Sequence, residues 1–222
     1  MVIQHPEPTV VQTRRAIEPP GLRFAAVCWP WLLSAVACAL SLLRTGYRFD
    51  VSNNAFHIPI VMRFAKLPQF ADDPFVLSLR RFVSPVYPLL SLIATDSNVA
   101  ALFFAGLAAT HLLTFLAFLR VGEACGIKRW REQTAFVFLV VASQALYGYS
   151  PVGADGLLID YFTHTELAQA IALFAIANVL RDRLVRSGAL AGLAFAVNAF
   201  VGVWMLAPIA AQVVLVPCGA LQ

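Results

Sequence analysis

Residues 99–119 read VAALFFAGLAATHLLTFLAFL, and no charged side chain occurs between Asp96 and Arg120. A helix needs about 20 mainly apolar residues to cross the hydrocarbon core of a bilayer, and this run is long enough. Of the 222 residues, 60% are hydrophobic and 13% are charged. Soluble proteins are about half apolar and roughly a quarter charged. The excess of apolar side chains predicts an all-α integral membrane protein.

Four further apolar runs predict spanning helices. They extend over Phe24–Leu43, Thr134 to about Tyr149, about Thr165 to Leu180, and from after Arg186 to Val216. The last run is too long for one straight span, because thirty residues of helix would measure about 45 Å. Pro208 therefore predicts a kink or an exit from the membrane. The spacing of Gly188 and Gly192 is typical of helices that pack closely.

The expected fold class is thus a multi-pass bundle of about five spans. Residues 24–222 would form a single transmembrane domain, which includes an outer loop over residues 44–98. Residues 1–23 are polar and proline-rich, and they predict a poorly ordered cytoplasmic tail. The first apolar run is too long for a cleavable signal and predicts a retained anchor. None of the four cysteines forms a C-x-x-C pair, and no disulfide is expected.

Basic residues alternate between the expected loops, and this pattern sets the orientation. Three loops or tails are basic, and their residues are Arg14, Arg15 and Arg23; Arg120, Lys128, Arg129 and Arg131; and Arg181, Arg183 and Arg186. The loop over residues 150–164 has no lysine or arginine. The first outer loop is an exception, because it carries five basic residues between Arg48 and Arg81, but its length of about fifty residues weakens the rule there. Cytoplasmic loops carry the excess of positive charge, which predicts a bacterial inner membrane protein with a cytoplasmic N-terminus. The net charge of +4 is explained by these clusters, and no nucleic-acid partner is expected.

The first outer loop, residues 44–98, is the least apolar part of the chain. Within it, Asn53–Lys66 reads NNAFHIPIVMRFAK. An apolar stripe, formed by Phe56, Ile60, Val61 and Phe64 with His57 and Arg63 off it, predicts an amphipathic helix in the outer interface. Asp73-Pro74 predicts the start of a second short helix that ends at Arg80-Arg81. The apolar stretch over residues 83–94 is too short to span and predicts an interfacial or re-entrant segment.

Polar residues of the two outer loops form the predicted site. The catalytic candidates are Asp50, His57, Asp155, His164 and Glu166, and the substrate-binding candidates are Asn53, Asn54, Arg80, Arg81 and Asp160. Polar side chains placed on loops above a rigid scaffold are where sites tend to be built. The alternative is that they are solvated loop charges. A divalent cation is conceivable for an Asp/His set, although no spacing matches a named metal motif, so the cofactor is left open.

Two stretches resemble bacterial polytopic proteins with the GT-C glycosyltransferase-like architecture. They are GYRFDVSNNAFHIPIVMRFAKLPQFADDPFVLSLRRFVSPVYPLL (46–90) and HTELAQAIALFAIANVLRDRLVRSGALAGLAFAVNAFVGV (164–203). The resemblance implies a catalytic acidic residue in the first outer loop, for which Asp50 is the nearest match. It also implies a sugar donor on a polyprenyl phosphate and further spans. Asn53 and Asn54 stand where an acidic pair is expected, and an amide cannot act as a general base.

Two functional classes follow from these features. The first is a GT-C-like protein that acts on lipid-linked sugars at the outer face. The second is a non-enzymatic membrane subunit that packs against a larger complex. A transporter is disfavoured because internal repeats are lacking. The transferase hypothesis requires the two outer loops to meet within about 10 Å, around a cavity to which Arg80 or Arg81 contributes.

Overall fold

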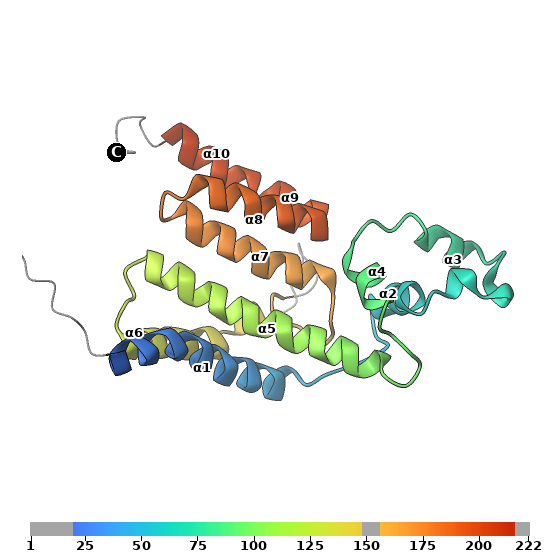
Figure 1. The fold of residues 1–222 in the computed structure, drawn as a ribbon, viewed down its shortest axis with the longest axis horizontal. Helices are drawn as coiled ribbons and strands as arrows, with labels where there is room; N and C mark the ends of the chain where they lie inside the picture. The colour runs from blue at the N-terminus through green and yellow to red at the C-terminus, as the bar shows by residue number, and fades with distance from the viewer. Residues whose placement is uncertain (1–19, 148–155, 216–222) are drawn as a thin grey trace, which may run out of the picture.

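The computed structural model describes residues 20–147 and 156–215, and this part of the chain is helical without strands. The α-helices are α1 (Pro20–Thr45), α2 (Asn54–Val61), α3 (Pro74–Leu79), α4 (Val86–Leu90), α5 (Val99–Ala124), α6 (Trp130–Ala142), α7 (His164–Val179), α8 (Leu184–Val197), α9 (Ala199–Trp204) and α10 (Leu206–Leu215). Short 3-10 turns are η1 (Phe64–Lys66), η2 (Pro68–Phe70) and η3 (Gln144–Leu146). Figure 1 shows the longer helices side by side in a bundle, with α2, α3 and α4 gathered beyond one end.

Two helices, α1 and α5, are long and apolar enough to cross a membrane. The qualifying segments are Cys28–Thr45 and Val99–Ala124. At 1.5 Å per residue, the 26 residues of α5 measure about 39 Å, which exceeds a hydrocarbon core of about 30 Å. These lengths weakly support a location in the membrane.

The other long helices are shorter than the sequence predicts. Helix α6 has 13 residues and α8 has 14, so they measure about 20 Å each. Helix α7 closely matches the predicted fourth run, but its 16 residues measure only about 24 Å. Helix α6 ends at Ala142 because Ser143 adopts an extended conformation. Five full spans are therefore not established by helix length.

The last apolar run is interrupted twice: unexpectedly at Asn198, and between α9 and α10, just before the expected kink at Pro208. The chain leaves the helical conformation at Asn198, which lies at φ −147° and ψ 108°, and α9 and α10 fold back along α8. The Asn198 side chain then accepts hydrogen bonds from the N–H groups of Phe200 and Val201, and so caps α9. Pro208 lies in the first turn of α10, where a backbone N–H has no partner within the helix.

Small residues bring α7, α8 and α9 together, although not those that the sequence indicated. The buried side chains between these helices include Ala168, Ala172, Ala175, Ala191 and Ala194. Gly188 and Gly192 face open space instead, with no atom within 4 Å of an added Cβ. At Gly202, by contrast, an added Cβ would lie 2.3 Å from the Cα of Phe195. This glycine permits the close approach of α9 to α8.

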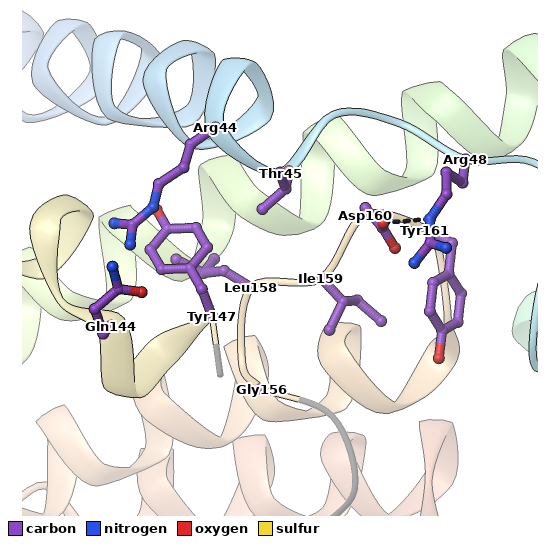
Figure 2. Close-up of a pocket in the computed structure, with 10 residues that line it drawn as sticks. All are labelled: Arg44, Thr45, Arg48, Gln144, Tyr147, Gly156, Leu158, Ile159, Asp160 and Tyr161. Carbon is purple, nitrogen blue, oxygen red and sulfur yellow. Dashed lines mark hydrogen bonds and ion pairs between the residues drawn. The ribbon is translucent and has the colours of Figure 1, made fainter. Parts of the chain in front are cut away.

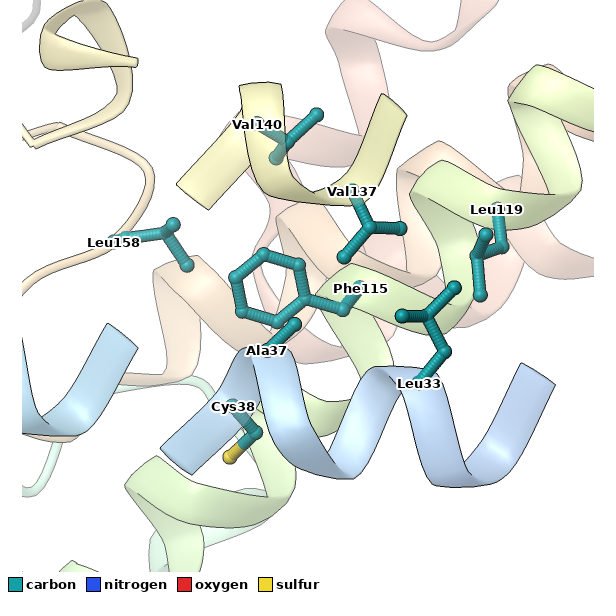
Figure 3. Packing of buried hydrophobic residues seen from close by; sticks show 8 residues of the cluster. All are labelled: Leu33, Ala37, Cys38, Phe115, Leu119, Val137, Val140 and Leu158. Carbon is teal, nitrogen blue, oxygen red and sulfur yellow. The ribbon is translucent and has the colours of Figure 1, made fainter. Parts of the chain in front are cut away.

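A second apolar core joins α1, α5 and α6 (Figure 3). The fully buried ring of Phe115 lies among side chains from all three helices. Leu158, in the segment that leads to α7, contributes to the same cluster. At the end of the bundle away from α2–α4, Arg181 donates hydrogen bonds to the Glu123 carboxylate and to the Arg120 carbonyl. These contacts fix the order of the helices and the position of the segment before α7.

Helices α2, α3 and α4 form a small lobe, residues 54–94, which we call the lobe hereafter. The predicted amphipathic helix is shorter than expected. Helix α2 ends at Val61, and Arg63 has a positive φ of 57°. Its buried side chains are Asn54, His57 and Val61, whereas Phe56 is 44% exposed. The side of α2 that carries Asn54 and His57 faces inward, because it packs against α4 and the end of the bundle.

The predicted helix at Asp73-Pro74 is confirmed. The Asp73 side chain accepts hydrogen bonds from the N–H groups of Phe75 and Val76, and Pro74 occupies the first helical position. The helix ends at Leu79, one residue before Arg80. The apolar stretch that follows contains only the five-residue helix α4. Both helices lie in the lobe, next to α2.

Candidate functional site

A cluster of aromatic and polar side chains joins the lobe to the bundle. The rings of His57 (α2) and Tyr87 (α4) stack with centroids 4.2 Å apart. The His164 ring, at the start of α7, lies 5.4 Å from the His57 ring, and Phe82 contacts both histidines. The two segments that the transferase hypothesis requires to meet therefore do meet. His57 and Tyr87 are almost completely buried.

Hydrogen bonds indicate which nitrogen of His164 carries the proton. The amide oxygen of Asn198 caps α9, so the amide nitrogen faces the His164 Nε2, at 3.4 Å, and donates to the Thr165 hydroxyl at 3.0 Å. We assign Nε2 as an acceptor, which leaves the proton on Nδ1. Nδ1 then donates to the Tyr87 hydroxyl at 3.2 Å, and this oxygen also accepts the backbone N–H of His164. His164 thus connects α4, α7 and the start of α9.

Both histidines of this cluster are neutral at physiological pH. Burial and, to a smaller extent, the nearby His164 lower the pKa of His57 to about 3. Burial also lowers the pKa of His164 to about 4. The burial of Tyr87 raises the pKa of its hydroxyl, which stays protonated. The cluster therefore supplies neutral donors and acceptors and no positive charge for a phosphate.

Several buried polar atoms of the cluster have no hydrogen-bond partner in the described part of the chain. They are both amide atoms of Asn54 and the Nδ1 of His57. A buried polar group without a partner costs about 1–3 kcal/mol. The junction between the lobe and the bundle is therefore held by ring stacking, apolar contacts and the bonds of Tyr87, rather than by Asn54.

Acidification is expected to destabilise the protein through these histidines. Their folded-state pKa values lie below the usual value of 6.5, so the unfolded chain binds more protons between pH 6.5 and about 3. The contribution of these histidines to the free energy of unfolding is constant above pH 6.5 and falls as the pH drops below it. For His57 the loss is on the order of 3 kcal/mol at pH 4. Thermal unfolding in detergent between pH 8 and 4 measures this slope. His57→Phe keeps the stacked ring and should flatten the curve; an unchanged curve would contradict the prediction.

A pocket of about 310 Å³ opens at the end of the bundle near the lobe. Figure 2 shows its walls, which come from the end of α1, from η3 and from the segment before α7. Its polar side chains are Arg44, Thr45, Arg48, Gln144, Tyr147, Asp160 and Tyr161. The Arg44 guanidinium lies over the Tyr147 ring, 4.0 Å from its centroid. Arg48 forms an ion pair with Asp160, so the described residues supply two cations and one carboxylate to the pocket.

Hydrogen bonds join the segment before the lobe, residues 48–52, to the segment before α7. The Arg48 N–H donates to the Asp160 carbonyl at 2.7 Å. The hydroxyls of Ser52 and Tyr161 lie 3.2 Å apart, within hydrogen-bond distance. The segment that follows Tyr161 then enters α7 through Thr163 and His164. The pocket and the histidine cluster are therefore connected by one short segment, residues 160–164.

The other predicted site residues that the structure describes do not line this pocket. Asp50 and Asn53 are exposed, and Asp50 has a positive φ of 59°. Glu166 is buried, and the Thr163 hydroxyl donates to its carboxylate. Arg80 and Arg81 are exposed on the lobe, and Asp155 lies outside the described residues. Contrary to expectation, neither Arg80 nor Arg81 lines the pocket at Arg44, Arg48 and Asp160, and Arg80 lines a different pocket on the lobe.

Sequence reasoning missed several residues that build the site. Tyr87 lies in a stretch that was interpreted only as interfacial. Its neighbours in the sequence do not indicate that its ring is buried or that its hydroxyl has a distant hydrogen-bond partner. Arg44 and Arg48 were not among the predicted site residues. Asn198 did give a signal, because an amide within a long apolar run needs a polar partner. Among the described residues, no group of three or more His, Cys, Asp or Glu side chains could hold a metal ion.

Comparisons with known proteins add no further assignment. No protein-family model, no curated protein and no solved structure matches this sequence.

Proposed function

We propose that this chain is a multi-pass inner membrane protein of GT-C-like type that acts on a lipid-linked sugar at the outer face. In this proposal the N-terminus is cytoplasmic, and the lobe lies outside. The arrangement in Figure 1 is consistent with it, because α1 ends, and α5 and α7 begin, at the bundle end that bears the lobe. The loops with Arg120, Lys128, Arg181 and Arg183 then lie together at the cytoplasmic end.

The pocket at Arg44, Arg48 and Asp160 is the observation that carries the proposal. It lies at the ends of the apolar helices, where the headgroup of a membrane lipid would be. Guanidinium groups match the geometry of phosphate oxygens and hold them with charge-assisted hydrogen bonds. Arg48 is more than half exposed in its ion pair, so its guanidinium is accessible to a ligand in this pocket. Arg44 and Arg48 would therefore bind the phosphate of a polyprenyl-phosphate-linked sugar.

Asp160 would then act as the general base. In the transfer step, an acceptor hydroxyl attacks the anomeric carbon and passes its proton to the Asp160 carboxylate. The bond between that carbon and the phosphate oxygen breaks, and the polyprenyl phosphate leaves with the electron pair. Arg48 would stabilise the charge that develops on the leaving oxygen. Asp160 thus takes the role that the family resemblance suggests for Asp50.

The neutral histidine cluster would serve as a positioning element. His164 and Tyr87 fix the start of α7, which directly follows the Asp160–Thr163 segment. A small displacement of a catalytic group lowers the rate strongly. His164 lies four residues after Asp160, so its contacts with Tyr87 would hold the Asp160 carboxylate in position. Neither histidine lines the Arg44–Asp160 pocket. We therefore assign His57 and His164 no contact with the substrate.

Asp160→Asn tests the proposal. Loss of a general base lowers the rate by about 10²–10⁴-fold, so we expect transfer from a polyprenyl-phosphate-linked hexose to fall at least 100-fold in membranes that contain the variant. Binding of polyprenyl phosphate by the purified protein should persist. The matched control is Asp182→Asn, which removes an acid at the other end of the bundle, where Asp182 accepts a hydrogen bond from Gln212.

The outcomes separate the two functional classes. Full transfer by Asp160→Asn would remove the proposed base. Failure of the wild-type chain to bind polyprenyl phosphate would remove the proposed donor site and favour the alternative, a non-enzymatic subunit. That alternative is supported by the apolar faces of α8 and α9, where Val185, Phe200 and Trp204 are exposed and could be covered by partner helices.

A further inference from the structure

A second pocket lies entirely within the lobe. Its volume is about 180 Å³. Its walls are Pro59, Ile60, Ala65, Val76 and Leu79, and its charged side chains are Arg63, Lys66 and Arg80. The lining is thus apolar apart from three cations, which come from the end of α2, from η1 and from the end of α3.

The positive charge around this pocket is not neutralised by any carboxylate in the described part of the chain. Arg63 donates to the hydroxyl and the carbonyl of Ser91, and Arg80 donates to the Ala65 carbonyl at 3.3 Å. These acceptors are neutral, and none of the three cations forms an ion pair among the described residues. Asp73 is the acid of α3, and its carboxylate caps that helix. The pocket therefore favours an anionic ligand.

The surface of the lobe is also unusually apolar. Its exposed large hydrophobic side chains are Phe56, Leu67, Phe75, Val83, Leu89, Leu92 and Ile93. Phe56 and Phe75 pack against each other on this surface, with ring centroids 5.7 Å apart. Apolar surface combined with lysine and arginine is the composition of segments that lie in the headgroup region of a membrane.

We propose that the lobe binds one anionic phospholipid, whose phosphate lies between Arg63, Lys66 and Arg80 and whose glycerol and upper acyl chain contact the apolar walls. The inference rests on the proposed membrane location but not on transfer chemistry, since the Arg44–Asp160 pocket has different walls. Free phosphate would gain nothing from Ile60, Val76 and Leu79. A zwitterionic lipid would gain less from three uncompensated cations.

The full-length chain, purified in an uncharged detergent, allows a direct test by native mass spectrometry. The probes are dioctanoyl phosphatidylglycerol, dioctanoyl phosphatidylcholine and inorganic phosphate. We expect phosphatidylglycerol to bind with a stoichiometry of one, and to bind more tightly than phosphatidylcholine. Each basic residue near an anionic lipid contributes substantially to binding, so Lys66→Gln combined with Arg80→Gln should weaken phosphatidylglycerol binding at least about tenfold.

A matched control has the same loss of charge outside the pocket. Arg81→Gln combined with Lys128→Gln removes two cations, of which Arg81 is next to Arg80 in the chain but does not line the pocket. This control should bind phosphatidylglycerol within about twofold of the wild type, because most surface charges act weakly at a distance. Lys66→Arg should also retain binding, which excludes misfolding as the cause of a loss.

Three results would overturn the inference. They are equal binding of phosphatidylglycerol and phosphatidylcholine, equal losses in the pocket variant and the control, and displacement of the lipid by millimolar phosphate. Asp160→Asn should bind phosphatidylglycerol as the wild type does. A loss of transfer in Asp160→Asn would then bear only on the proposed function. A loss of phosphatidylglycerol binding in the Lys66/Arg80 variant would bear only on the proposed lipid site of the lobe.

Discussion

Replacing Gly202 with alanine is expected to destabilise the protein more than any other single methyl addition that the structure suggests. The added Cβ would lie 2.3 Å from the Cα of Phe195 and 2.6 Å from its backbone nitrogen. Since these are backbone atoms, no side-chain rotation relieves the clash, and α9 must move away from α8. Overpacking typically costs about 1–3 kcal/mol, and we expect the upper end of this range. Thermal unfolding in detergent measures the loss.

Gly192→Ala is the matched control for this substitution. Gly192 lies in α8, where an added Cβ meets no atom within 4 Å. Alanine favours a helix over glycine by about 0.5–1 kcal/mol, so this variant should be as stable as the wild type or slightly more stable. Equal stability of Gly202→Ala and Gly192→Ala would mean that α8 and α9 do not approach each other closely.

Replacing Tyr87 with alanine is expected to release the lobe from the bundle. Tyr87 is completely buried, stacks on His57 and makes both hydrogen bonds to His164. Removal of a large buried ring costs about 3–5 kcal/mol. We expect a lower melting temperature and faster cleavage by protease within the lobe. Tyr87→Phe keeps the ring and should lose only about 1–2 kcal/mol.

Leu89→Ala provides the control within the same short helix. Leu89 lies two residues from Tyr87 in α4 but is 62% exposed, so its truncation should change the melting temperature little. If Tyr87→Ala and Leu89→Ala lowered the melting temperature equally, the junction would not depend on the buried ring.

Features governed by neighbouring residues were predictable from the sequence. The start of α3 at Asp73-Pro74 is an example, because an N-cap depends on a carboxylate and on N–H groups within three residues. The apolar run over residues 99–119 likewise forms one continuous helix, α5.

Features that depend on distant contacts were predicted less well. The side of α2 that packs against the protein was not predicted: it carries His57 and Asn54, because Tyr87 and Phe82 come to that side of the helix. The reversal of the chain at Asn198 depends on Gly202, which lets α9 pack on α8. Periodicity alone does not distinguish a single long helix from two helices that fold back.

The sequence by itself determined that the chain is helical and apolar, where α3 and α5 begin, and that His57 and His164 lie near one end of the helices. Composition and short-range capping are local, so these properties need no knowledge of the fold. Only the tertiary structure decided that His57 contacts Tyr87 and His164, and that Arg44, Arg48 and Asp160 share a pocket. Arg48 and Asp160 are far apart in the chain, and the packing of α1, α5 and α7 brings them together.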